Sequence, residues 1–268
     1  MARPQMGTKI SKDKREGIEA MIALDISNSM LAEDVAPSRL ERSKRLVEDL
    51  LNHFTNDKIG LVVFAGDAFV QLPITADYIS AKMFLDNISP SLIGSQGTDI
   101  AKAIELSQHS FTQNSKFGKA IIIITDGENH EGGAEEMARK AQKAGIRVFI
   151  LGIGSTAGAP IPMDDGSYLQ DKNGQTVMTK LNEDMCRKVA EAGKGMYIHV
   201  DNTAAAEQML DNEIAKMQHG EIESVSYSDY ADQFPALAAI VLLLLIAEAL
   251  LMERKNPLLN RINLFTKK

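Results

Sequence analysis

The sequence has little cysteine and no excess of positive charge. Cys186 is the single cysteine among 268 residues, which excludes an intramolecular disulfide framework and a cysteine-rich zinc site. Lysine and arginine number 29 against 36 acidic residues, giving a formal net charge of −7. Because nucleic-acid binding requires an excess of positive charge, this balance argues against a nucleic-acid partner.

Common catalytic motifs and a secretory signal are also missing. The sequence has no Gly-x-Ser-x-Gly elbow, no His-Glu-x-x-His pair and no phosphate-binding loop. The first residues, MARPQMGTKISKDKREG, lack an apolar core and do not form a signal peptide. Export of the chain would therefore need a hydrophobic segment upstream, and otherwise the main domain stays in the cytoplasm.

Apolar runs alternate with helical patterns along the chain. Runs rich in Ile and Val predict strands buried on both faces, at residues 17–24, 58–64, 120–125 and 146–153. A short strand is predicted at 196–200. Helical patterns lie at 37–54, 77–88, 99–112, 134–144, 182–192 and 203–217. This alternation predicts an α/β fold with a doubly wound, mostly parallel sheet. The short Gly66-Asp67 link makes residues 68–72 an antiparallel edge strand.

Two further segments complete the predicted organisation. Residues 155–180 are dense in Gly, Pro, Asn and Asp and predict an inserted β-hairpin, with strands at 167–170 and 175–179. The expected division of the chain is an N-terminal linker 1–16, a main domain 17–218, a juxtamembrane linker 219–233, a transmembrane helix 234–252 and a cytoplasmic tail 253–268.

The transmembrane prediction rests on the run FPALAAIVLLLLIAEALLM at 234–252, which only Pro235 and Glu248 interrupt. A helix of this length spans roughly 28 Å, close to the thickness of a bilayer core. Basic residues follow the run, whereas residues 219–233 contain acidic residues and neither Lys nor Arg. The positive-inside rule then places the tail in the cytoplasm and residues 1–233 outside.

Polar side chains gather where predicted strands end. Asp25, Ser27 and Ser29 follow the first strand, Asp126 follows the run at 120–125, and a glycine-rich loop delivers Thr98 ahead of a helix. The carboxyl ends of parallel strands meet at one edge of a sheet, where ligands bind, and we expect these residues on that exposed edge. Two carboxylates and three hydroxyls form an oxygen-only set that suits Mg²⁺ or Mn²⁺.

This pattern resembles a known family. Asp25-x-Ser27-x-Ser29, Thr98 and Asp126-Gly127 resemble the metal-ion-dependent adhesion site of a von Willebrand factor A domain, over about residues 17–217. More narrowly, the chain resembles the Bat (Bacteroides aerotolerance) family of membrane-anchored bacterial proteins. The segments that carry this second resemblance are Ala2-Arg3-Pro4-Gln5, residues 25–30, Pro37-Ser38-Arg39-Leu40, and the hairpin 158–179 followed by a terminal hydrophobic helix.

The resemblance implies a set of metal ligands. The two serines would bind directly, Thr98 directly or through water, and the two aspartates directly or through bound waters. The remaining coordination position would take a Glu or Asp of a protein partner. Residues 128–131 are candidates to shape partner choice, although an ordinary solvated loop is the preferred interpretation.

The family resemblance also implies a cellular location and protein partners. In it the Ala-Arg-Pro-Gln stretch follows an N-terminal membrane segment, which implies an upstream anchor, a periplasmic main domain and an inner-membrane location. Other Bat proteins and a MoxR-type AAA+ ATPase are the implied partners.

Two functions from different classes fit the strand-end aspartates. The first is a non-enzymatic, divalent-metal-dependent protein-binding module. The second is an Mg²⁺-dependent phosphotransferase of haloacid-dehalogenase type, which requires a second Asp two residues after the nucleophile. That position is Ser27 in this sequence, so the binding module is preferred.

Overall fold

The structure is a computed structural model that describes residues 10–54, 57–113, 117–128, 131–163, 165–201, 203–215, 217, 220–227 and 241–247. The chain divides into two units, residues 14–222 and a smaller unit formed by residues 1–13 and 223–268. The larger unit contains most of the sheet, all labelled helices and every predicted site residue.

A mostly parallel sheet organises the larger unit, with the strand order β3-β2-β1-β4-β5-β8. Only β3 is antiparallel to its neighbour along this path, as its short connection to β2 predicts. The strands are β1 (Ile10–Asp25), β2 (Lys58–Phe64), β3 (Ala68–Thr75), β4 (Gly118–Thr125), β5 (Ile146–Gly152) and β8 (Lys194–His199).

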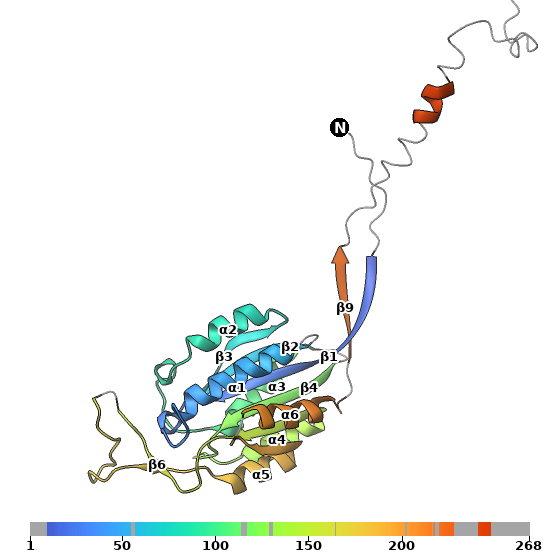
Figure 1. Ribbon diagram of the computed structural model, residues 1–268. Coiled ribbons are helices and arrows are strands. Elements are labelled where there is room, and N and C mark those ends of the chain that lie inside the picture. The colour runs from blue at the N-terminus through green and yellow to red at the C-terminus, as the bar shows by residue number, and fades with distance from the viewer. Residues whose placement is uncertain are drawn as a thin grey trace, which may run out of the picture. The chain divides into compact units, whose positions relative to one another are not determined.

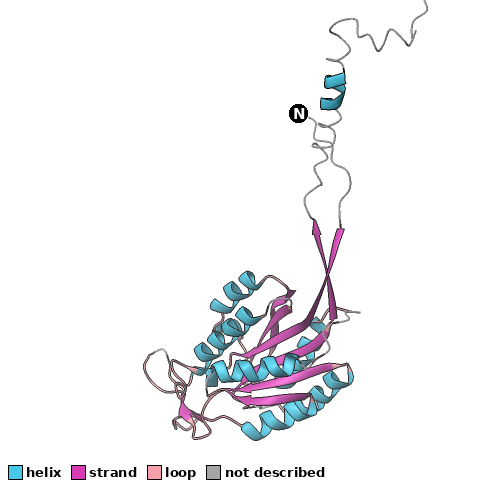
Figure 2. Cartoon of the chain, turned by 45° about the vertical axis from the view of Figure 1, so that its right-hand side comes forward, coloured by secondary structure: helices cyan, strands magenta, loops and turns pink. Residues whose placement is uncertain are grey.

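Helices cover both faces of this sheet (Figures 1 and 2). One core cluster joins the sheet to α1, α2 and α6, and the other joins it to α3, α4 and α5. Burial on both faces explains why β1, β4 and β5 are continuous apolar runs without alternation. The helices are α1 (Arg39–His53), α2 (Tyr78–Asp86), α3 (Ile100–Ser110), α4 (Ala134–Lys143), α5 (Glu183–Ala192) and α6 (Thr203–Ala215). Two short 3-10 helices, η1 (Asn28–Leu31) and η2 (Pro90–Leu92), lie in loops.

Polar residues fix where several helices begin. Ser38, Asp77, Asp99 and Asn182 each accept a hydrogen bond from a backbone N–H in the first turn of α1, α2, α3 and α5. Such caps satisfy backbone donors that have no partner within the helix. They explain why the observed helices begin one or two residues after the start of the predicted patterns.

The strands of the expected hairpin differ from the prediction. Pairing in the insertion begins at its base, where β6 (Ala159–Pro160) is antiparallel to β7 (Met178–Thr179). Isolated bridges Pro162–Tyr168 and Gln170–Thr176 continue the antiparallel pattern through the expected strands. The insertion is therefore a hairpin with little regular ladder, because turn residues interrupt it repeatedly.

Both expected linkers contribute strand. β1 begins at Ile10, inside the predicted N-terminal linker, and β9 (Gly220–Tyr227) forms within the predicted juxtamembrane linker. The two strands pair. Pairing of the two segments with one another was not visible in either segment alone.

The predicted transmembrane helix lies mostly outside the described residues. Residues 241–247 of the 234–252 run are described, and they are helical. Within the described part of the chain, no helix combines the length and apolar character needed to cross a membrane.

Burial predicts which residues stabilise the sheet. Ile122 is fully buried in β4, and truncation to Ala leaves a cavity that costs about 2–5 kcal/mol of unfolding free energy. Ile79 in α2 is 76% exposed, so Ile79→Ala should change it by less than about 0.5 kcal/mol. Urea unfolding followed by circular dichroism measures both, and equal losses would contradict the assignment of the core.

Candidate functional site

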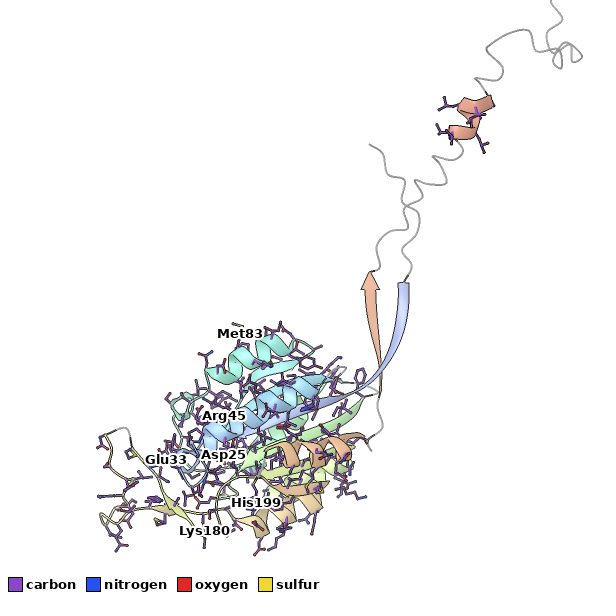
Figure 3. All side chains as sticks on the ribbon, in the orientation of Figure 1. Asp25, Glu33, Arg45, Met83, Lys180 and His199 are labelled. Atoms are coloured by element: carbon purple, nitrogen blue, oxygen red, sulfur yellow. The ribbon has the colours of Figure 1, made fainter. Side chains whose placement is uncertain are left out.

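The two predicted aspartates follow neighbouring parallel strands. Asp25 is the last residue of β1, and Asp126 comes directly after β4, which pairs with β1. From β1 the strand order continues to β2 on one side and to β4 on the other. This topological switch point is where open α/β sheets bind ligands. In Figure 3 Asp25 lies at the end of the sheet nearest the hairpin, as do Lys180 and His199.

Hydrogen bonds fix both oxygens of the Asp25 carboxylate. Its Oδ2 accepts from the Thr125 hydroxyl at 2.7 Å, and its Oδ1 accepts from the Ser27 backbone N–H at 2.9 Å. The Ser27 and Ser29 hydroxyl oxygens are 2.9 Å apart. The first loop therefore presents a held carboxylate beside a pair of hydroxyls.

Thr98 reaches the same edge from the loop before α3. The Asp99 backbone N–H donates to the Ala65 carbonyl, just past β2, at 2.8 Å. The Asn28 backbone N–H donates to Gln96 Oε1 at 3.2 Å, which joins this loop to the loop of the serines. Thr98 is 1% exposed, and its Oγ1 has no hydrogen-bond partner among the described residues. A buried hydroxyl in this state can accept a ligand or a water as its partner.

Asp126 is held by a buried arginine. Arg39, the first residue of α1, donates from Nη1 to Asp126 Oδ2 at 2.8 Å, and both side chains are fully buried. The Glu128 backbone N–H donates to Asp126 Oδ1 at 3.1 Å. Between them Gly127 has a φ of +75°, and a Cβ there would lie 2.6 Å from the Cys186 sulfur. Glycine is therefore required for the turn that presents Asp126.

Burial disfavours the ionised form of both carboxylates. Removal from water, and then the charge of Asp126, raises the pKa of Asp25 to about 7. Burial also raises the pKa of Asp126, against the lowering effect of a Ser29 hydrogen bond and the Arg39 charge. Two like charges without solvent favour an added proton or a cation between them.

The five predicted residues therefore come together at one sheet edge, but they are not on an exposed surface. Asp25, Asp126, Ser27, Ser29 and Thr98 are all buried, with at most 7% of any one exposed. The expectation of exposure was wrong because η1, the loop before α3 and the segment around Thr179 cover the strand ends.

Sequence analysis did not identify the residues that hold these five. Thr125 contacts Asp25, and Arg39 contacts Asp126. Sequence analysis assigned Thr125 only to a strand, and Arg39 only to a segment shared with the Bat family. Glu128 accepts a hydrogen bond from the Lys180 backbone N–H at 3.0 Å, so it also holds the hairpin base. Of the other candidates beside it, Asn129 and His130 lie outside the described residues and Glu131 is exposed.

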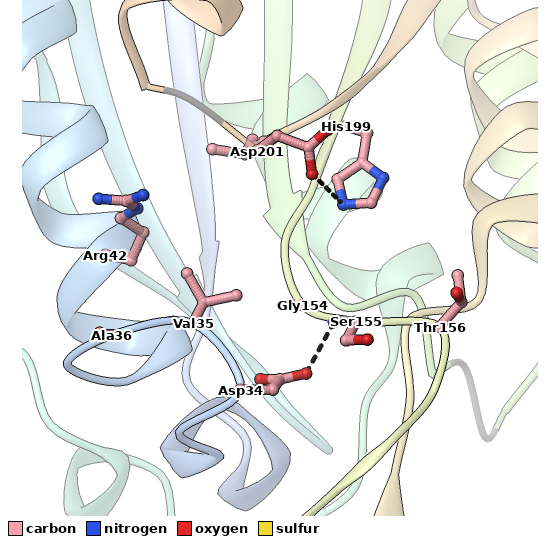
Figure 4. Close-up of a pocket in the computed structure, with 10 residues that line it drawn as sticks. Asp34, Val35, Ala36, Arg42, Gly154, Ser155, Thr156, His199 and Asp201 are labelled. Atoms are coloured by element: carbon pink, nitrogen blue, oxygen red, sulfur yellow. Dashed lines mark hydrogen bonds and ion pairs between the residues drawn. The ribbon is translucent and has the colours of Figure 1, made fainter.

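Two cavities flank the site. One, of about 500 Å³, is lined by Asn28, Leu31, Ile93, Gln96, Pro162 and Met163 among others. Since Asn28 stands between Ser27 and Ser29, this cavity adjoins the site directly. The second, of about 400 Å³, lies between the start of α1 and the ends of β5 and β8 (Figure 4). Its walls include Asp34, which accepts a hydrogen bond from the Ser155 backbone N–H at 2.7 Å.

Known proteins share this fold and sequence. Residues 20–128 match the von Willebrand factor type A domain family. The crystal structure of BatB from Bacteroides thetaiotaomicron is 57% identical, covers 75% of this chain and 98% of its own, and gives a TM-score of 0.73. An aerotolerance-related membrane protein from Bacteroides fragilis is 56% identical, with coverage of 75% and 100% and the same TM-score.

More distant proteins extend the comparison. An uncharacterized protein of Borreliella burgdorferi is 32% identical over 56% of this chain, and the match spans 46% of that protein's length. Proximal thread matrix protein 1 from the mussel byssus is 16% identical, with coverage of 77% and 48% and a TM-score of 0.56, and its structure has a zinc-occupied MIDAS motif. That likeness shows the fold. The match to BatB over nearly its whole length shows more: the chain belongs to the Bat family of von Willebrand factor type A domain proteins.

Proposed function

We propose that the larger unit is a divalent-metal-dependent protein-binding module. The observation that carries the proposal is the buried Thr98 hydroxyl without a hydrogen-bond partner among the described residues, at an edge shared with two buried carboxylates. A hydroxyl, a hydroxyl pair and two desolvated carboxylates form an unbalanced set that a hard cation would satisfy. The residues present therefore fit the metal that the family implies.

Asp25, Ser27, Ser29, Thr98 and Asp126 would hold the ion, Mg²⁺ or Mn²⁺. A bound divalent cation would supply a positive centre that attracts an external carboxylate. The protein's own contribution is orientation. Thr125 and the Ser27 N–H fix the Asp25 carboxylate, and Arg39 fixes that of Asp126.

The partner would present an acidic side chain next to an apolar one. The adjoining 500 Å³ cavity is lined by Leu31, Ile93, Pro162 and Met163 and has no charged residue among its lining residues. An apolar side chain near the captured Asp or Glu would gain about 25 cal/mol for each Å² it buries there. We infer that other Bat proteins and a MoxR-type AAA+ ATPase are the partners, as the family resemblance implies.

The alternative phosphotransferase remains the weaker candidate. It requires a carboxylic acid at position 27, two residues after Asp25, whereas Ser27 directs its hydroxyl towards Ser29 at 2.9 Å. Release of phosphate from an aryl phosphate in the presence of Mg²⁺ would favour the phosphotransferase.

The Asp25 pKa predicts how metal and pH act on stability. In the metal-free protein a folded-state pKa of about 7, above the usual 3.8, gives stability that is present below pH 4 and is lost as pH rises through 7. That loss is on the order of 2–4 kcal/mol. Mg²⁺ should therefore stabilise the protein more at pH 8 than at pH 5.5, because at pH 8 the Asp25 carboxyl is already ionised and does not have to lose a proton to bind the ion.

Asp25→Asn tests this prediction by thermal melts with EDTA and with Mg²⁺. The variant should lose both the decline in stability between pH 5.5 and 8 and the Mg²⁺ effect. Asp184→Asn, the same change at an exposed position, should retain both. Mg²⁺ stabilisation that survives in Asp25→Asn would show that the ion binds elsewhere.

Partner capture should depend on metal. The wild-type chain is expected to retain partners from detergent-solubilised membranes in Mg²⁺ and to release them in EDTA, and Ser27→Ala/Ser29→Ala should retain none in either. Ser107→Ala/Ser110→Ala removes two hydroxyls from the far end of α3 and is the matched control. Equal recovery in Mg²⁺ and EDTA would contradict carboxylate capture, although not the fold.

We also propose that residues 234–252 anchor the chain in the inner membrane with the larger unit in the periplasm. The similar Bacteroides fragilis protein is described as a membrane protein, and the charge distribution around the apolar run sets the orientation.

A thiol reagent that cannot pass the inner membrane tests the orientation in intact cells with a permeable outer membrane. Lys172→Cys, in an exposed turn of the hairpin, should be labelled before inner-membrane lysis. Cys186 is fully buried, so the unsubstituted chain is the blank. Thr266→Cys, in the tail, should be labelled only after lysis. The reverse order would place the larger unit in the cytoplasm.

A further inference from the structure

Arg39 is a fully buried arginine that contacts two carboxylates. Its Nε and Nη2 donate to the two oxygens of Asp34, each at 2.8 Å, in a bidentate pair. Its Nη1 donates both to Asp126 Oδ2 at 2.8 Å and to Thr179 Oγ1 at 2.9 Å. Arg39 therefore has one partner at the proposed metal site, Asp126, one at the hairpin base, Thr179, and a third, Asp34.

The charges of Arg39, Asp34 and Asp126 are unevenly distributed relative to the proposed metal site. Arg39 carries one positive charge and pairs with two carboxylates, Asp34 and Asp126. Hydrogen bonds from Arg39 and the Ser155 N–H hold the pKa of Asp34 below its usual range despite its partial burial. The further contact of Arg39 with Asp126 therefore takes negative charge from a carboxylate that faces the proposed cation. A cation at the site would meet two carboxylates, one of which already neutralises a guanidinium.

The space around Arg39 is fitted to this position. Gly154 has a φ of +117°, and a Cβ there would lie 2.6 Å from Arg39 Nε. Removing a guanidinium from water is costly unless its donors are satisfied. Here the Thr179 carbonyl accepts a further Nη2 bond at 3.3 Å, so every nitrogen of the group has a partner.

We infer that Arg39 sets the charge of the proposed metal site, so that the site binds its cation less tightly and the bound cation attracts an external carboxylate more strongly. The inference rests on the proposed function. A purely structural role is the alternative, since Arg39 also holds the hairpin through Thr179 and, by way of Asp34, through Ser155. The two roles predict opposite effects of Arg39→Gln/Asp34→Asn on metal affinity and different effects of acetate on Asp34→Asn.

Asp34→Asn is the decisive variant. Asn keeps an oxygen for the Ser155 N–H and for Arg39, and Asp34 lies on the wall of the 400 Å³ cavity, where water can enter (Figure 4). The change removes one of the two anions that pair with Arg39 and leaves Asp126 as its remaining charged partner. Mg²⁺ affinity in chloride buffer should fall about fivefold or more, whereas the gain in Mg²⁺ affinity caused by acetate, a mimic of the partner carboxylate, should increase.

Arg39→Gln/Asp34→Asn should reverse both effects. With the guanidinium gone, Mg²⁺ should bind at least as tightly as to the wild type, and acetate should add little. Arg39→Lys keeps the charge and should stay near wild type in both measurements. Arg42→Gln, the same loss of charge one turn along α1, is the control for net charge.

Isothermal titration of Mg²⁺ in chloride and in acetate buffers gives both quantities, with circular dichroism as the check on folding. Weaker Mg²⁺ binding in the double variant than in Asp34→Asn, or no change in either variant, would overturn the inference and leave the metal site standing. If the double variant does not fold, the acetate dependence of Asp34→Asn decides: an acetate gain no larger than that of the wild type would overturn the inference. A wild type that binds no Mg²⁺ would overturn the proposed function and the inference together.

Discussion

The arrangement of the site depends on two carboxylates buried side by side at the ends of paired parallel strands. Asp25 and Asp126 are fully buried, and burial raises the pKa of each. A fold tolerates such a pair only if surrounding donors stabilise it. The Thr125 hydroxyl and the Arg39 guanidinium each supply one such donor, and the proposed divalent cation would complete the stabilisation of the pair.

The sheet explains why these groups meet. The site lies between β1 and β4, where the chain changes direction across the sheet, at the carboxyl edge that loops cover. The hairpin insertion then limits this edge on one side. Because Arg39, Asp34 and Glu128 bond to its two ends, hairpin position and site geometry are parts of one hydrogen-bonded assembly.

Much of this was visible in the sequence. The runs at 58–64 and 120–125 predicted β2 and β4 closely because burial on both faces makes the middle of such strands continuously apolar. The five site residues follow strands or precede a helix, so their convergence followed from topology. Arg39 was not predicted as a site residue, because its partners Asp34, Asp126 and Thr179 are separated by up to 140 positions from it and no local pattern joins them. β9 was not predicted for the same reason, since its partner strand lies at the other end of the chain.

The burial of Cys186 has a consequence for redox chemistry. Removal from water, and then the negative charge of Asp126, raises the pKa of this thiol to about 12. Oxidants react with the thiolate, and access to the sulfur is needed as well. By contrast Met83, Met163, Met178 and Met209 are each more than 40% exposed. An oxidant that reaches the folded domain should therefore react first with these exposed methionines, and the expected product is methionine sulfoxide.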